Sequence, residues 1–256
     1  MAVKPAAKLI ASTRMDHTPQ YSPDGNHIAF GSNRTGSHEI WVCDGDGSNA
    51  VQLTSFGGPY TADPHWSPDG RWIMFSSRAE GHSGLYLIPS SGGRPKLLRN
   101  IFNAEPSGWS RDGKWIYFTS ERAGEPQVWR VPAEGGDPAQ VTRTTGSPES
   151  PDGGAVYFLK NGALWKIPAG GGQETQVLPS VINNDFAVVA RGIYFIPDSE
   201  KPSIQFLNFA TGKIATIAPA SPGFAYGFSV SPDERWILYS QPEPADNGLM
   251  LVENFR

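Results

Sequence analysis

The sequence has few of the features that would indicate a disulfide-bonded, membrane-bound or nucleic-acid-binding protein. Cys43 is the single cysteine among 256 residues, which excludes an internal disulfide and a zinc cage made of cysteines. No stretch approaches the length of an apolar membrane span, and residues 1–10 contain two lysines but no apolar run typical of a signal peptide. The net charge is −4, without a run of Lys or Arg, so we expect no direct nucleic-acid binding and no membrane insertion.

Helical periodicity is also missing, and what the sequence has instead is a recurring turn. The motif is SPDG at residues 22–25, 67–70 and 150–153, SRDG at 110–113, and SPDE at 231–234. Asp-Gly between two apolar runs is a strong hairpin signal, because Asp and Gly tolerate the positive φ that both central residues of such a turn require. Each copy therefore predicts a hairpin with positive φ at both central positions.

The residues around the turn repeat as well. A β-rich run follows each copy, such as 72–75, and a second run such as 85–88 comes next. A glycine-rich turn and a further short strand, such as 95–98, complete the unit. Four strands in a unit of this size are typical of a β-propeller blade.

The spacing of the units gives the number of blades. Successive copies of the turn are 45, 43 and 40 residues apart, and the last gap of 81 residues has room for one further unit. In that gap Arg191-Gly192 takes the place of the turn, and strands are expected at 193–196, 204–208 and 214–217. The sequence thus predicts an all-β, six-bladed propeller of four-stranded antiparallel blades, with blades starting near residues 13, 58, 100, 144, 181 and 221.

The two ends of the chain are predicted to close the ring. The sixth blade ends after its third strand at 249–252, while residues 7–11 form an apolar segment with no blade of their own. We expect residues 7–11 to supply the outer strand of blade six, which removes an exposed sheet edge. Residues 1–256 are then one propeller domain, and we expect a monomer.

Acidic residues recur where the chain leads into the first strand of a blade. In a propeller these segments lie at the mouth of the central channel, and five of the six carry an acid. The candidate ligand-binding residues are His17, Asp63, His65, Glu105, Glu149 and Asp185. Such a ring would suit a divalent cation such as Ca²⁺ in the channel, or a cationic partner; the alternative is a solvated acidic rim that caps turns.

Three of these residues raise further questions. Asp63 and His65 share strand parity and so are expected to point to one face, where the carboxylate could orient the imidazole for acid–base chemistry. Glu149 takes the position before the turn where other blades have Tyr21, Trp66 or Trp109. A charge there is costly unless it is paired or wet, so Glu149 either faces channel water or pairs with a neighbour such as Arg143.

Arginine recurs between the second and third strands of the first three blades, at Arg34, Arg78 and Arg122. Repetition at one position indicates a structural contact from blade to blade. The functional alternative is an anion-binding arc on the top face, which would suit an acidic sugar or a peptide carboxylate.

The repeat that reads WSPDGRWIMFSSR at 66–78 and LYLI at 85–88 resembles the repeat of TolB-type six-bladed propellers. More narrowly, EIWVCD at 39–44, VQLTSFGGP at 51–59 and the ending LVENFR resemble the C-terminal propeller of bacterial winged-helix transcriptional regulators with a membrane-separated sensor region. This resemblance implies a non-enzymatic sensing or interaction module. The compartment would be periplasmic for an excised sensor domain and cytoplasmic otherwise.

Three functions remain open from the sequence. The favoured one is a non-catalytic propeller that binds a small molecule or a protein through its channel mouth and top-face loops, because no nucleophile, base and orienting residue are recognisable. The second is a metal-assisted lyase or hydrolase that uses the channel acids and His65. The third is a purely architectural repeat. A prolyl-peptidase-like hydrolase is excluded because the sequence has no Gly-x-Ser-x-Gly motif.

Overall fold

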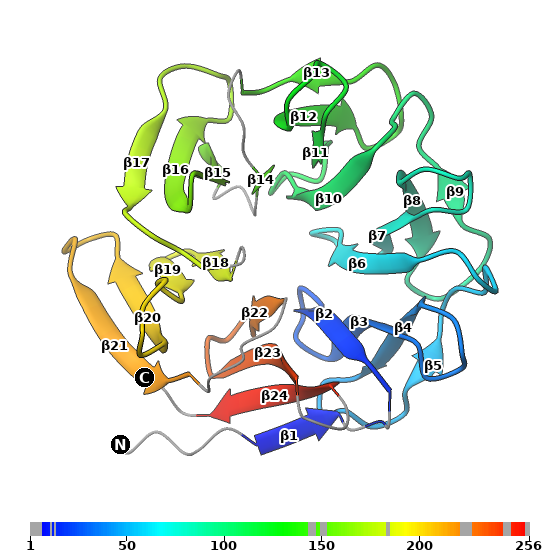
Figure 1. Ribbon diagram of the computed structural model, residues 1–256, viewed down its shortest axis with the longest axis horizontal. Helices are drawn as coiled ribbons and strands as arrows, with labels where there is room; N and C mark the ends of the chain where they lie inside the picture. The colour runs from blue at the N-terminus through cyan, green and yellow to red at the C-terminus, as the bar shows by residue number, and fades with distance from the viewer. Residues whose placement is uncertain are drawn as a thin grey trace.

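The computed structural model describes residues 7–10, 12, 14–142, 147–148, 153–182, 185–220, 227–242 and 247–253. They form six separate sheets, each of four antiparallel strands. The sheets are arranged as a ring around a centre (Figure 1). The protein is therefore a six-bladed β-propeller, as predicted. Among the described residues, no helix is long and apolar enough to cross a membrane.

The innermost strand of each blade lies nearest the centre of the ring (Figure 1). In blades one to six these strands are β2 (Asp16–Tyr21), β6 (Thr61–Trp66), β10 (Ala104–Trp109), β14 (Ser147–Pro148), β18 (Phe186–Val189) and β22 (Phe228–Val230). We call the face on which they begin the top face, and the opposite one, which carries the repeated turns, the turn face.

The second and third strands form the middle of each blade. The second strands are β3 (His27–Ser32), β7 (Trp72–Ser77), β11 (Trp115–Ser120), β15 (Ala155–Lys160), β19 (Gly192–Phe195) and β23 (Trp236–Pro242). The third strands are β4 (Glu39–Asp44), β8 (Gly84–Pro89), β12 (Gln127–Pro132), β16 (Ala163–Pro168), β20 (Ser203–Asn208) and β24 (Asn247–Glu253). The outer strands of blades one to five are β5 (Val51–Gln52), β9 (Lys96–Leu97), β13 (Ala139–Gln140), β17 (Thr175–Leu178) and β21 (Ile214–Pro219).

The N-terminal strand closes the ring. β1 (Ala7–Ile10) is the outer strand of blade six and pairs antiparallel with β24, with Ala7 opposite Leu251 and Ile10 opposite Leu249. Ile10 is buried in a cluster that also contains Ile28 and Phe30 of blade one. Closure therefore combines strand pairing within blade six with an apolar contact to the next blade.

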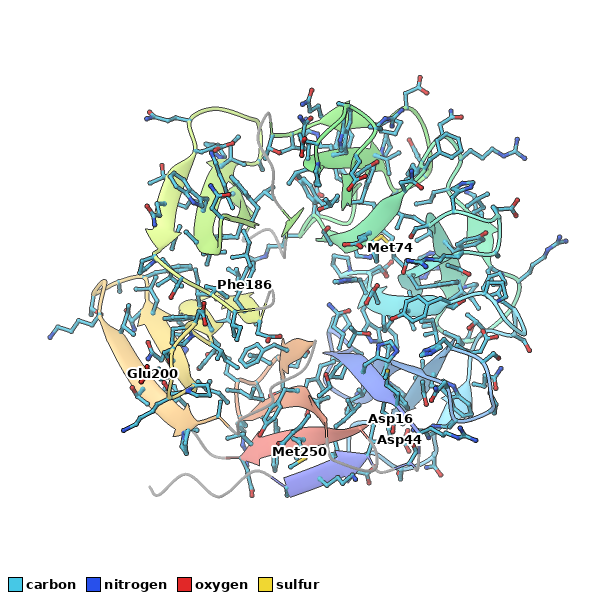
Figure 2. The ribbon with its side chains drawn as sticks, in the orientation of Figure 1. Asp16, Asp44, Met74, Phe186, Glu200 and Met250 are labelled. Carbon is cyan, nitrogen blue, oxygen red and sulfur yellow. The ribbon has the colours of Figure 1, made fainter. Side chains whose placement is uncertain are left out.

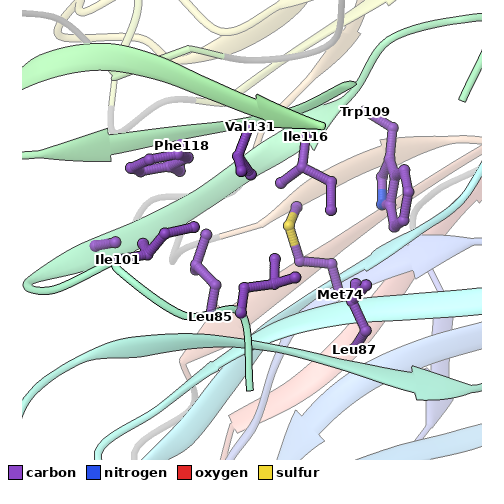
Figure 3. Close-up of a cluster of buried hydrophobic side chains, with 10 residues drawn as sticks. Met74, Leu85, Leu87, Ile101, Trp109, Ile116, Phe118 and Val131 are labelled. Atoms are coloured by element: carbon purple, nitrogen blue, oxygen red, sulfur yellow. The ribbon is translucent and has the colours of Figure 1, made fainter. Parts of the chain in front are cut away.

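The second strands have apolar residues at successive positions, as in β7, because both of their faces are buried. In β7, Ile73 and Phe75 pack with blade one, while Met74 between them packs with blade three. Successive side chains of a strand point to opposite faces, so each blade contributes alternate residues to two cores. Figure 3 shows one of these cores, in which Trp109 of blade three lies beside Met74 of blade two.

The repeated turns form hairpins, but the predicted turn geometry was wrong. In the first copy φ is positive at Gly25 and not at Asp24. The N–H of Gly25 donates to the carbonyl of Ser22 at 2.9 Å. The side chain of Asp24 instead accepts hydrogen bonds from the Ser22 hydroxyl at 2.6 Å and from the N–H of Asn26 at 3.0 Å. Asp is therefore required as an acceptor, and Gly alone supplies the left-handed conformation.

Blades five and six depart from the repeat in a complementary way. Arg191 replaces the usual turn of blade five, and Glu234 replaces glycine in the turn of blade six with φ of 54°. The Arg191 Nε donates to Glu234 Oε2 at 2.8 Å, and the Tyr194 hydroxyl donates to the same oxygen at 3.1 Å. The two irregular turns thus bind each other. In the copy at 150–153, residues 150–152 lie outside the described residues.

Candidate functional site

The inner strands of the first three blades are bulged near the top face. The register shifts between His17 and Gln20 in β2, between Ala62 and His65 in β6, and between Pro106 and Gly108 in β10. Asp63 itself has a φ of 58°. A bulge places two residues opposite one and so breaks the alternation of faces. Strand parity alone therefore does not place Asp63 and His65 on one face, and their joint role stays a prediction.

Asp16 and Arg34 form a buried ion pair within blade one. Arg34 Nη2 donates to Asp16 Oδ1 at 2.8 Å, and the Asp16 side chain is fully buried where β2 begins (Figure 2). The Arg34 guanidinium also lies over the rings of Phe30 and Trp41, at 5.0 and 4.9 Å. These contacts hold the two sides of one blade together and leave Arg34 only 19% exposed.

The two other repeated arginines have different surroundings. The guanidinium of Arg78 lies 5.8 Å from the centroid of the Tyr60 ring. Arg122 lies 4.9 Å from the Trp129 ring and donates to the carbonyl of Asn100 at 3.3 Å. Both are exposed. The predicted arc of three equivalent arginines is therefore reduced in this geometry to two exposed members, and its binding of an anion stays a prediction.

Asp63 and Glu105 are the two candidate acids that lie close enough to influence each other. Burial first, and the negative charge of Glu105 second, raise the pKa of Asp63 to about 6, while a hydrogen bond from Ser76 opposes the rise. The Ser76 hydroxyl donates to Asp63 Oδ2 at 3.2 Å. Glu105 itself is exposed. This part of the channel mouth therefore carries an excess of negative charge.

A cavity on the top face, between blades two and three, joins two of the candidate residues. It has a volume of about 570 Å³. Its lining includes Arg78, His82 and Ser83 from blade two and Asn103, Glu105, Thr119, Ser120 and Glu121 from blade three. Phe102, which is 55% exposed, lies 5.2 Å from the His82 ring between their centroids. The cavity, called here the top-face pocket, thus offers both signs of charge and an exposed aromatic ring next to His82.

Neither His65 nor Asp185 lines this pocket. Burial lowers the pKa of His65 to about 4, so its imidazole is neutral at pH 7. Burial raises the pKa of Asp185 to about 8, and the nearby N–H of Gly227 opposes the rise without reaching hydrogen-bond geometry. Neither oxygen of Asp185 has a hydrogen-bond partner among the described residues. Glu149 and Arg143 lie outside the described residues.

His17 belongs to a separate group of rings at the junction of blades one and two. Burial first, and the neighbouring His38 second, lower the pKa of His17 to about 4. The ring centroids of His17 and His38 are 5.7 Å apart, and the Tyr60 ring lies against both. His38 lies in the loop before β4 and is half-buried.

The channel acids do not form a metal centre in the part of the chain that the structure describes. There, no group of three or more His, Cys, Asp or Glu side chains is placed to hold a metal ion. The Ca²⁺ site proposed from the sequence thus has no complete set of ligands in this part, although Glu149 is not covered by this finding. Asp63 and Glu105 are brought together; His65 and Asp185 are not shown to join them.

Several residues of the site were missed in the sequence. Tyr60 and Phe102 come just before inner strands, and their exposed fractions of 42% and 55% are unusual for aromatic side chains. Glu121 and His82 lie in the loops that carry Arg122 and Arg78. The sequence did point to these loops, because Arg78 and Arg122 recur in them. Which side chains meet across the gap between two blades could not be read from one sequence.

A comparison with protein families shows to which family the chain belongs. The model of the TolB beta propeller domain matches residues 3–107 and 64–185, which together cover more than half of the sequence. This match agrees with the six four-stranded blades and the repeated turn. The chain belongs to the family of TolB beta propeller domains.

Solved structures with the same fold have several functions. A protein named as a TolB from Agrobacterium tumefaciens has a TM-score of 0.72 and 21% identity, with 96% of this chain and 92% of that one covered. A gluconolactonase from Xanthomonas campestris has a TM-score of 0.73 and 14% identity, covering 97% and 89%. An oligogalacturonate lyase in complex with manganese has a TM-score of 0.66 and 14% identity, covering 97% and 93%. These likenesses show the fold alone. No curated protein sequence matches the chain.

Proposed function

We propose that this protein is a non-catalytic binding propeller that holds a polar ligand, or a segment of a partner protein, in the top-face pocket. The observation that carries the proposal is that Arg78 and Glu105, contributed by neighbouring blades, line one cavity of about 570 Å³. A concave site with a few convergent polar groups is the usual form of a ligand pocket.

The composition of the pocket indicates what the ligand presents. Arg78 is a donor suited to a carboxylate, whereas Glu105 and Glu121 are acceptors suited to an amine or a guanidinium. A peptide segment with one acidic and one basic group would satisfy both. Phe102 at the edge of the site adds an exposed aromatic ring, a residue type enriched in binding surfaces.

Sensing is the role that this proposal favours. The sequence resembles the C-terminal propellers of winged-helix regulators, and in that setting a ligand held between two blades would signal to a separate part of the protein. This more specific assignment rests on the resemblance at residues 39–59 and 251–256 and is part of the proposal.

A second candidate function is a lyase or hydrolase centred on Asp63. The observation in its favour is the pKa of Asp63, which burial raises to about 6. A carboxyl group that titrates near neutrality can exchange a proton with a substrate. Turnover of a sugar acid that is lost in Asp63→Asn but retained in Glu80→Gln would favour this function over binding alone.

The test of the binding function is a calorimetric titration with the dipeptide Lys-Glu and with galacturonate as probes. We expect saturable binding of the dipeptide that is weakened at least 10-fold by Arg78→Gln and by Glu105→Gln. Arg122→Gln and Glu80→Gln are the matched controls, since both residues are exposed on the same face and neither lines the pocket. Binding that survives both pocket variants would contradict the proposal, as would conversion of either probe.

A further inference from the structure

A group of three rings lies on the top face where blades one and two meet, apart from the top-face pocket. His17 belongs to β2, His38 to the loop before β4, and Tyr60 to the loop before β6. The ring centroids of the two histidines are 5.7 Å apart, and those of His38 and Tyr60 are 4.7 Å apart. Two imidazoles from one blade are thus held next to each other and covered by a tyrosine from the next blade.

His17 has one ring nitrogen engaged and one unused. Nδ1 is 3.1 Å from the hydroxyl of Thr18, whereas Nε2 is buried without a hydrogen-bond partner among the described residues. With the proton on Nδ1 donated to Thr18, Nε2 has a free lone pair. Metal-binding histidines commonly have this arrangement, because a hydrogen bond from the second nitrogen fixes the tautomer and the ring orientation.

His38 also has a ring nitrogen without a hydrogen-bond partner in the described part of the chain, its buried Nδ1. Burial also lowers the pKa of His38, as it does for His17, so both rings are neutral at pH 7. A neutral imidazole is the form that binds metal ions, since no proton competes for the lone pair. A buried polar atom without a partner is unfavourable, and an ion bound to both nitrogens would give each of them a partner.

The backbone beneath His17 leaves space for the ring. Gly31 of β3 lies under it, and a Cβ at this position would be 2.5 Å from Cε1 and 2.9 Å from Nε2 of His17. Any residue with a side chain would therefore displace the ring. The φ of Gly31 is not in the left-handed region, so the glycine is required here for room rather than for its conformation.

We propose that His17 and His38 form a two-histidine site for a divalent transition-metal ion of the class that prefers imidazole, such as Zn²⁺ or Cu²⁺. A separation of 5.7 Å between ring centroids fits an ion bound by one nitrogen of each ring at the usual distance of about 2.0–2.1 Å for Zn–N. Imidazole nitrogens favour these ions over Ca²⁺. Water or a group of a bound partner fills the other positions, because no third ligand is grouped with the pair among the described residues.

The charge of Arg78 should lower the affinity of this site for a metal ion. Its guanidinium lies 5.8 Å from the centroid of the Tyr60 ring and so places a positive charge at the edge of the cluster. Repulsion between like charges weakens the binding of a cation. Removing this charge with Arg78→Gln should therefore tighten metal binding, the opposite of its effect on the dipeptide in the top-face pocket.

The test is a titration of the chelator-treated full chain with Cu²⁺ and Zn²⁺, followed by electron paramagnetic resonance of the Cu²⁺ form. We expect one ion per chain and hyperfine coupling to two imidazole nitrogens. His38→Asn should weaken binding at least 10-fold, and His17→Gln should do the same if it folds. The matched control is His82→Asn, a half-buried histidine on the same face whose ring contacts Phe102; it should change affinity less than 2-fold.

Three results would overturn the proposal. They are no saturable binding of either ion, an affinity that His38→Asn leaves unchanged, and coupling to a single nitrogen. Because the His82→Asn control lies in the top-face pocket, loss of binding there instead would assign the ion to the pocket and also contradict the two-histidine site. The dipeptide titration is independent of these outcomes.

Discussion

The two faces of the propeller differ in how far their contacts repeat from blade to blade. On the turn face, Ser22, Ser67, Ser110 and Ser231 each donate to the aspartate two residues later at 2.5–2.6 Å. Each of these hydroxyls also accepts the N–H of the first residue of the next strand, at 2.9–3.0 Å. One solution to the same problem, the closing of a tight turn, is therefore used in four blades.

On the top face the equivalent positions differ from blade to blade. The bulge of β2 has Thr18 where the bulge of β6 has Asp63, and their φ angles are 47° and 58°. Arg34, Arg78 and Arg122 occupy one repeated position, yet Arg34 is paired with a buried carboxylate and Arg78 lines a pocket. A residue that repeats from blade to blade thus indicates a structural role in the blade. Its surroundings in each blade decide whether it can also bind a ligand.

Not every departure from the repeat belongs to a binding site. Arg191 and Glu234 break the turn motif in neighbouring blades, and they bind each other on the turn face. One change compensates for the other. A residue that departs from the repeat is a functional candidate when a buried polar atom of its side chain has no hydrogen-bond partner among the described residues, as for the ring nitrogens of His17 and His38.

The largest effect on stability is expected for a substitution of Asp16, which tests the structural role of one top-face acid against an exposed one. Asp16→Ala should lower the free energy of unfolding by about 3–5 kcal/mol, because it leaves the Arg34 charge without its buried partner. Chemical denaturation measures this change. Glu105→Gln, at an exposed acid of the same face, should change stability by less than about 0.5 kcal/mol. Equal effects would mean that the two acids do not differ in role.

A smaller effect, the same in several blades, is expected on the turn face. Ser67→Ala should cost about 1–3 kcal/mol, since it removes the acceptor of the Trp72 N–H and the donor to Asp69. Ser110→Ala should give a similar value, measured by urea unfolding. Ser91→Ala, at an exposed serine of this face, is the control. A cost confined to one blade would argue against a common structural role for the turn.

The pH dependence of stability separates the buried acids of the top face. The pKa of Asp185 is raised from 3.8 to about 8 in the folded protein, so the folded state retains a proton that the unfolded state has lost. The contribution of Asp185 to stability should therefore fall as pH rises between these values, by at most about 1.4 kcal/mol per pH unit. Asp63 and the two histidines His17 and His65 also titrate below about pH 6.5, so unfolding midpoints should show the Asp185 slope between pH 6.5 and 8, and Asp185→Asn should remove it there.

The matched control for Asp185 is Asp63→Asn. The pKa of Asp63 is raised from 3.8 only to about 6, so this variant should remove a contribution that falls with pH below pH 6 and leave the slope above pH 6.5 unchanged. A slope near pH 7 that persists in Asp185→Asn would contradict the assignment to Asp185.

The fold was predictable because each of its determinants is local in sequence. The turn motif and the apolar runs beside it recur in each blade, so even the altered fifth blade could be found from the position of 191–192. Closure by residues 7–11 followed from counting strands. The type of turn was wrong because the side chain of Asp24 serves as a hydrogen-bond acceptor, which the pattern Asp-Gly does not reveal.

The site was predictable only in part because it depends on contacts between blades. Arg78 and Glu105 were both identified, but their common cavity depends on loops 27 residues apart in sequence. Strand parity could not decide the relative orientation of Asp63 and His65, because a bulge intervenes. The pairing of His17 with His38 required knowing that the loop before β4 folds back over β2, and nothing in the spacing of the two histidines indicates this.

Ring closure by β1 has a consequence for synthesis of the protein. β1 ends at Ile10, and β24, the strand with which it pairs, begins only at Asn247. At about 5–20 residues per second, the ribosome needs on the order of 10–50 s to make the chain between them. During that interval β1 is a strand without a sheet, and a chaperone has that long to bind it. Within the propeller, the strand that is made first is thus among the last to pair.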